Sequence, residues 1–175
     1  ALHNARINAR SRPPSSGNPW VGDGAQRCTS YGVHASYNST IECPDLSVDD
    51  CGNRAVHASG GSVVNFTGGS AKNCGGPAVF ATSASTINAS NVDASGSDIG
   101  FQAGNGSTVN ATQSVADGCK QGFYAYGAST IAAEASSAKN CTNTGYFAEK
   151  SSTINAHEAN ADGCYRGFES REDST

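Results

Sequence analysis

The sequence predicts an all-β fold: a right-handed single-chain parallel β-helix (solenoid) of about eight coils of 22–23 residues, with three short strands per coil. Two observations carry this prediction. One motif recurs at nearly constant spacing through the chain, and apolar and polar residues alternate with a period of two inside each repeat. A chain of 175 residues is long enough for one domain with its own core and too short for two.

The repeat is anchored on an aliphatic residue. The tetrapeptide Ser-Thr-Ile-Asn occurs at Ser85–Asn88 and again at Ser152–Asn155, with close variants elsewhere. Its aliphatic residue recurs at spacings of 23, 23, 22, 22 and 23, as Ile41, Val64, Ile87, Val109, Ile131 and Ile154. Ten residues after each anchor stands Cys51, Cys74, Ser97, Cys119, Cys141 or Cys164. The length of the repeat varies only in the stretch between this cysteine column and the next Gly-Phe-like segment. We therefore expect that connecting stretch to be a loop.

Within each repeat, alternate residues are suited to opposite sides of a strand. In Ser-Thr-Ile-Asn-Ala the Ser, Ile and Ala point one way and the Thr and Asn the other, which is the period of a β-strand. A second strand is expected five to seven residues after the anchor, and a third at the Gly-Phe-x-Ala segment. Each strand would pair in parallel with its copy one coil away, at about 4.8 Å. Like residues would then stack as interior columns.

The cysteines fit this interior. Six of the seven cysteines share one column, and Cys43 falls in another. In-register neighbours point the same way, which favours free thiols that behave as small core residues over disulfides, and both over metal ligands. The four histidines form no metal-ligand pattern, so we expect neither a metal nor a cofactor.

We expect residues 1–175 to form one domain. Both ends fall inside a repeat, so we also expect this domain to be a fragment of a longer β-helix. Cys28 follows Ile7 by 21 residues instead of ten, which predicts an inserted loop at about 11–24. This loop contains the single tryptophan and three of the five prolines.

Composition excludes several partners. The net charge of −4 gives no reason to expect nucleic acid or an anionic membrane, and no stretch approaches the about 20 apolar residues of a membrane span. No two acids occupy one column on neighbouring coils, so the carboxylates read as solvated surface charge and not as a pair for glycoside cleavage.

Two outward columns remain. The first reads His34, His57, Phe80, Gln102, Tyr124, Phe147 and Glu169. Stacked aromatic residues of this kind suit burial against a neighbouring subunit, which we favour, or stacking on a sugar. The second, an array of Thr and Asn, superficially resembles an ice-binding surface, but these residues simply suit a strand surface.

The coil, written as Gly-Phe-x-Ala, Ser-Thr-Ile-Asn-Ala and Ala-x-x-Cys, resembles repeats of bacteriophage tail fibres and tailspikes of the pectate-lyase-like β-helix class. The resemblance implies a homotrimer on the virion tail that binds bacterial surface polysaccharide. We therefore expect a shaft segment that presents a host-glycan binding surface. The alternatives are a depolymerase, hydrolase or lyase, with an active site between subunits, and a β-helix adhesin of the bacterial cell surface. No catalytic residue of the family can be assigned to this chain.

The inserted loop is the expected binding feature, because loops on rigid scaffolds concentrate binding residues. Trp20 offers a flat face for a sugar ring, or else packs as a lid or against a neighbouring chain. The candidate glycan-binding residues are Trp20, Arg10, Arg12, Asn18, Asp23, Tyr124 and Phe147.

Overall fold

Two parallel sheets of seven strands each form the protein in the computed structural model, which describes the backbone of residues 6–8 and all of residues 28–175. The narrow sheet has strands of three residues: β1 (Arg6–Asn8), β3 (Thr40–Glu42), β5 (Val63–Asn65), β7 (Thr86–Asn88), β9 (Thr108–Asn110), β11 (Thr130–Ala132) and β13 (Thr153–Asn155). The wide sheet has strands of five or six: β2 (Tyr31–Ala35), β4 (Arg54–Ala58), β6 (Pro77–Ala81), β8 (Ile99–Gly104), β10 (Gln121–Tyr126), β12 (Thr144–Glu149) and β14 (Arg166–Ser170).

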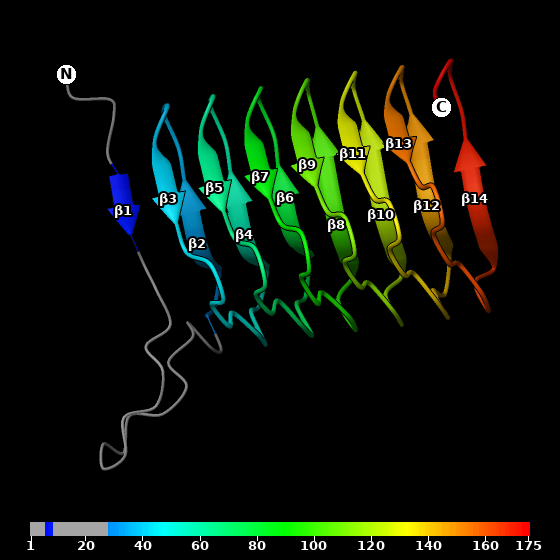
Figure 1. Ribbon diagram of the computed structural model, residues 1–175, viewed down its shortest axis with the longest axis horizontal. Coiled ribbons are helices and arrows are strands. Elements are labelled where there is room, and N and C mark those ends of the chain that lie inside the picture. Colours follow the sequence, from blue (N-terminus) through cyan, green and yellow to red (C-terminus); the bar gives the residue numbers. More distant parts are fainter. Residues whose placement is uncertain (1–5, 9–27) are drawn as a thin grey trace, which may run out of the picture.

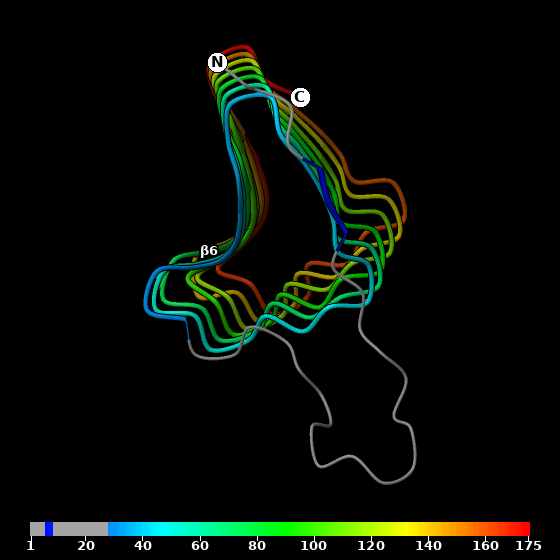
Figure 2. The same cartoon turned by 90° about the vertical axis from the view of Figure 1, so that its left-hand side faces the viewer.

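The chain alternates between the two sheets and advances by one strand in each at every turn. Figure 1 shows the coils side by side along the longest axis, and Figure 2, at right angles to it, shows successive coils nearly superimposed. Six complete coils run from β2 to β13, with β1 and β14 belonging to partial coils. This count is lower than the predicted eight because most of the first repeat lies outside the described residues.

The register confirms the predicted columns. Along the narrow sheet each anchor pairs with the next, from Ile41 through Val64 to Ile154. Along the wide sheet the inward column of Val, Phe and Tyr runs from Val56 to Phe168. The anchors Val64, Ile87, Val109 and Ile131 are 0% exposed, as are Phe101 and Phe123. The interior therefore consists of like side chains stacked at the spacing of the strands.

The strand predicted five to seven residues after the anchor is wrong in extent, whereas the one predicted at Gly-Phe-x-Ala is the strand of the wide sheet. In place of the former, each coil makes a single parallel bridge to the next, through Ser47, Ser70, Asp93, Val115, Ser137 and Asn160. Residues with positive φ stand two positions before and three after the bridge, as Asp45 and Asp50 do around Ser47. The extended run between them is too short for a longer strand.

Each coil contains four residues with left-handed backbone. Two form the corner between the sheets, one precedes the bridge, and one precedes the loop that leads to the wide sheet. The position three residues after the bridge holds only residue types that tolerate left-handed backbone: Asp50, Asn73, Gly96, Gly118, Asn140 and Gly163. The column before the bridge is less selective and includes Ala135, with φ of 51°.

The cysteine column lies in the core as predicted. Cys51, Cys74, Cys119 and Cys141 are buried and Cys28 and Cys164 half-buried, and no disulfide joins any of the seven cysteines. Burial raises the pKa of Cys51 and of Cys119 to about 12, so these thiols stay neutral. The thiol of Cys119 donates to the carbonyl of Ala94 at 3.4 Å. The cysteines are thus packing residues with weak donors.

A second interior ladder is made by serine. The hydroxyl of each Ser in the Ser-Thr-Ile-Asn motif accepts the backbone N–H of its counterpart one coil earlier, at 3.1–3.2 Å, in the series Ser39, Ser62, Ser85, Ser107, Ser129, Ser152 and Ser174. These N–H groups lie at the corner between sheets, where the interior would otherwise leave them unpaired. The serine therefore completes the hydrogen bonding between coils.

Replacing Ile131 by Asp tests the inward assignment. An unpaired carboxylate among side chains that are 0% exposed costs more than about 4 kcal/mol, so we expect loss of folding as measured by circular dichroism and urea titration. The adjacent Thr130 is exposed, and Thr130→Asp is expected to cost less than about 1 kcal/mol. Equal losses would mean that the two faces of β11 are assigned in reverse.

Ala135→Gly tests the left-handed column. The substitution removes the steric penalty that a Cβ carries at positive φ, so the free energy of unfolding should rise by about 0.5–1 kcal/mol. Ala132→Gly, in the extended backbone of β11, should lower it by a similar amount. Urea titration of both variants measures the difference, and a loss of stability at both positions would contradict the assignment.

Candidate binding surface

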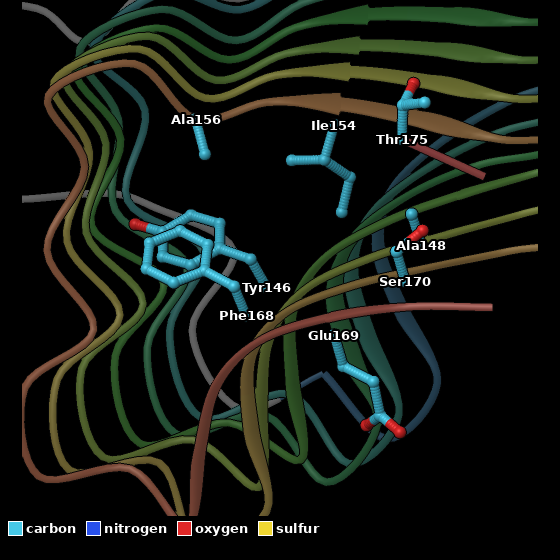
Figure 3. A pocket seen from close by; sticks show the side chains of 8 residues that line it. All are labelled: Tyr146, Ala148, Ile154, Ala156, Phe168, Glu169, Ser170 and Thr175. Atoms are coloured by element: carbon cyan, nitrogen blue, oxygen red, sulfur yellow. The ribbon is translucent and has the colours of Figure 1, made fainter.

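The outward column of the wide sheet is where the described part of the chain gathers aromatic and charged side chains. We call His34, His57, Phe80, Gln102, Tyr124, Phe147 and Glu169 the aromatic column. Its members alternate along each strand with fully buried residues such as Val56 and Ala58, so they project from the outer face. Figure 3 shows this at β14, where Glu169 points to the opposite side of the ribbon from Phe168. The predicted outward direction is confirmed.

The rings cover one another. His57, Phe80 and Phe147 are 8%, 7% and 8% exposed even though they lie on the outer face. The rings of His57 and Phe80 have centroids 5.3 Å apart and planes within 6°, and those of His34 and His57 are 4.8 Å apart. Register at strand spacing therefore turns the surface rings into two stacks, His34–His57–Phe80 and Tyr124–Phe147, with Gln102 between them.

Tyr124 and Phe147, both candidate glycan ligands, are brought together by this stacking. Their centroids are 5.2 Å apart and their planes within 6°. Arg171, from the coil on the other side, places its guanidinium carbon 5.3 Å from the centroid of Phe147. The Tyr126 ring lies 5.3 Å from that of Tyr124. Both faces of Phe147 thus have partners within the protein, and its role in binding stays a prediction.

Polar groups surround this pair of rings. The Tyr124 hydroxyl donates to Oε1 of Glu149 at 2.6 Å, and burial together with this carboxylate raises the pKa of Tyr124. Glu149 lies 3.8 Å from the ammonium group of Lys150. Such fixed hydroxyl and carboxylate groups beside aromatic edges are suited to hydrogen bonding with a polar ligand.

Glu169 closes the column with two arginine partners, Arg166 at 3.5 Å and Arg171. A carboxylate held between two guanidinium groups is committed to its ion pairs. Within residues 28–175, then, both arginines at this end of the outer face have a carboxylate partner.

The remaining candidate residues are the five of the inserted loop, Trp20, Arg10, Arg12, Asn18 and Asp23. All five lie outside the described residues. Their predicted part in binding is therefore neither confirmed nor contradicted.

The outer face of the narrow sheet is a hydrogen-bonded ladder. Asn110 donates to Asn88 at 2.6 Å, Asn88 to Asn65 at 2.5 Å, and Asn65 to Glu42 at 2.7 Å. The amide groups are used to hold one coil to the next. This supports the structural interpretation of the Thr and Asn array.

Acids on the bridge side also tie coils together. Oδ1 of Asp49 accepts the Ser70 hydroxyl at 2.6 Å and the Lys72 backbone N–H at 2.7 Å. Oδ1 of Asp117 accepts the equivalent groups of Ser137 and Lys139 at 2.6 and 2.8 Å. Sequence reasoning took these acids for solvated charge. The signal that could have revealed these hydrogen bonds is a serine and a lysine one coil later, at the positions of Ser70 and Lys72 for Asp49.

A cavity of about 210 Å³ opens at the last coil. Tyr146, Ala148, Ile154 and Phe168 are among the residues that line it (Figure 3). These residues occupy interior columns that are buried in earlier coils, so the cavity is an end of the interior stack and not a cleft in its side.

Two further classes of site find no support in the described part of the chain. No group of three or more His, Cys, Asp or Glu residues there is placed to hold a metal ion. The same residues include no helix with the length and hydropathy needed to cross a membrane.

Comparison with known proteins bears on the architecture. A family model described as the right-handed β-helix region matches residues 27–175. The chain belongs to the right-handed β-helix family. This confirms the predicted fold and gives the coil its hand. Neither curated proteins nor solved structures give a significant match.

His57 gives the surface a pH dependence. Burial, together with the nearby Arg54 and His34, lowers the pKa of His57 from 6.5 to about 4. Between these two pH values the unfolded chain binds a proton that the native protein does not. Stability is therefore complete above pH 6.5 and falls as the pH drops toward 4.

Phenylalanine occupies the position of His57 one coil later, so His57→Phe is the matched variant. We expect it to raise the melting temperature more at pH 5 than at pH 8, which thermal scans at both pH values measure. As a control, His157 is largely exposed, and His157→Asn should leave the pH dependence unchanged. An equal gain for His57→Phe at both pH values would contradict the assignment.

Proposed function

We propose that the chain is a rigid shaft segment of a bacteriophage tail fibre or tailspike, and that it presents a binding surface for polysaccharide of the host bacterium. The observation that carries the proposal is the outer face of the wide sheet, where aromatic and charged side chains recur once per coil. The outer face of the narrow sheet, by contrast, holds mainly Thr and Asn that bond to one another.

The scaffold suits a repeating ligand. Parallel strands fix successive side chains at about 4.8 Å, and stacked interior columns leave little freedom for one coil to move against the next. Side chains of the aromatic column are therefore preorganised, which reduces the entropy lost on binding a polymer.

Binding is favoured over cleavage of the polysaccharide. Glycoside hydrolysis uses two carboxyl groups on either side of the scissile bond. Glu169 is held by two arginines, and Asp49 and Asp117 accept hydrogen bonds from the next coil. These acids have structural partners.

The virion location and a homotrimeric assembly come from the resemblance of the repeat to tail-fibre and tailspike sequences. A bacterial surface adhesin would use the same face in the same way. The trimer bears on how the face is used, because aromatic residues of one chain can pack on a neighbouring chain as well as on a sugar.

Substitution of Tyr124 tests the proposal. On an array of bacterial surface polysaccharides, we expect Tyr124→Ala to weaken glycan binding by at least about tenfold, as is usual for a central aromatic contact. Tyr124→Phe keeps the stack on Phe147 but loses the hydroxyl bond to Glu149, so an intermediate loss is expected. Trp20→Ala, measured in parallel, reports whether the loop contributes.

Tyr37 is the matched control, because it is 76% exposed and lies at the corner between sheets, away from the aromatic column. Tyr37→Ala should bind as the wild type does. Light scattering is recorded for every variant. If Tyr124→Ala breaks an oligomer and binding of glycan is unchanged, the face is a subunit contact and the proposed surface is wrong.

A further inference from the structure

The N-terminal part of the wide sheet carries a second group of side chains on its outer face. Tyr31, His34, Arg54, His57 and Phe80 come from β2, β4 and β6, and we call them the histidine cluster. The Tyr31 ring lies 5.0 Å from that of His34 and 5.3 Å from that of His57, which in turn stacks on Phe80. Five side chains thus form one contiguous patch.

Arg54 has no carboxylate partner in this patch. Its guanidinium carbon lies 4.9 Å from the centroid of Phe80 and 5.6 Å from that of Tyr31, and Nη1 donates to the Tyr31 hydroxyl at 3.0 Å. Strands β2, β4 and β6 contain no acidic residue at all. Arg166 and Arg171, at the other end of the same face, both pair with Glu169. Among the described residues, by comparison, the guanidinium of Arg54 has no carboxylate partner.

The cluster also contains buried polar atoms that no described residue satisfies. Nε of Arg54 and both ring nitrogens of His57 are inaccessible to solvent and have no hydrogen-bond partner. The His57 side chain is only 8% exposed, and a buried donor left without an acceptor loses its hydration with nothing to replace it. Natural proteins contain few such groups, and each one calls for an explanation. Because neutral histidine has a single N–H, the patch holds two buried donors that no described residue satisfies, at Arg54 Nε and on the His57 ring, and they indicate a missing acceptor.

We propose that the histidine cluster is a binding site for an oxyanion, a carboxylate or a phosphate carried by the ligand. Guanidinium groups match both anions in geometry and charge. Because the Tyr31 hydroxyl accepts from Arg54, its own O–H is left to donate, and exposed His34 adds a further donor. The lone pairs of an oxyanion can accept from the guanidinium of Arg54 and from the single N–H of the neutral His57 ring. The anion site itself is independent of the proposed function. The assignment of the anion to a glycan rests on that function.

The test titrates the 175-residue protein with sodium phosphate, with glucuronate and with neutral glucose, at pH 7 and constant ionic strength, while the ring resonances of His34 and His57 are followed by NMR. We expect saturable shifts with at least one of the two anions and none with glucose. Saturable shifts with only phosphate, or with only glucuronate, identify which oxyanion the site binds.

Arg54→Gln should weaken anion binding at least tenfold, and Arg166→Gln, which changes the same net charge on the same sheet, should not. If Arg54→Gln does not fold, Arg54→Lys replaces it: the charge and stem remain, the forked donor is lost, and affinity should still fall severalfold. Absence of saturable shifts with both anions, equal shifts with glucose, or equal losses for the Arg54 and Arg166 variants would overturn the site. Glycan binding is measured separately on the array, so a negative result for the anion site leaves the proposed glycan-binding function untouched, and the reverse also holds.

Discussion

Everything described in this molecule depends on one constraint: each coil bonds in parallel and in register to a copy of itself 22 or 23 residues along the chain. Main-chain hydrogen bonds fix that register at every strand and at the single-residue bridge. Like residues are then forced on top of one another, whatever their chemistry. Aliphatic anchors, phenylalanine rings, serine hydroxyls and asparagine amides each form a ladder because the backbone leaves them no other neighbour.

The same constraint distributes polar chemistry unevenly over the outer faces. Where a column holds groups that are both donor and acceptor, as asparagine does, the ladder satisfies itself and presents little to a ligand. Where rings lie beside a cation, as around Arg54, stacking buries the rings and leaves Nε of Arg54 and the ring nitrogens of His57 without a hydrogen-bond partner among the described residues. On a solenoid, ligand binding is therefore expected where the side chains of a column cannot supply hydrogen-bond partners for one another.

Spacing alone was enough to predict the fold, the anchors and the buried columns, because a period of two fixes the direction of Ile131 or Phe123 once the strand is found. It did not predict that the strand after the anchor shrinks to a single bridge, which depends on left-handed residues such as Ala135 and Asp45 that composition does not mark clearly. Pairing across coils was also missed: the contacts of Asp49 with Ser70, or of Glu169 with Arg171, depend on side-chain conformations. The candidate residues Tyr124 and Phe147 were placed together by the aromatic column, but the arginine that covers Phe147 comes from a turn that the motif does not specify.

One further consequence follows from the loop between the cysteine column and the wide sheet, which absorbs the difference between coils of 22 and 23 residues. The interior positions of a coil meet the same kinds of neighbour above and below, so two coils are interchangeable as structural modules. Unequal recombination within the gene, which adds or removes one repeat, would then yield a protein that still folds. Such a rod could change its reach by single coils over evolutionary time, while the chemistry of its outer faces drifts one coil at a time.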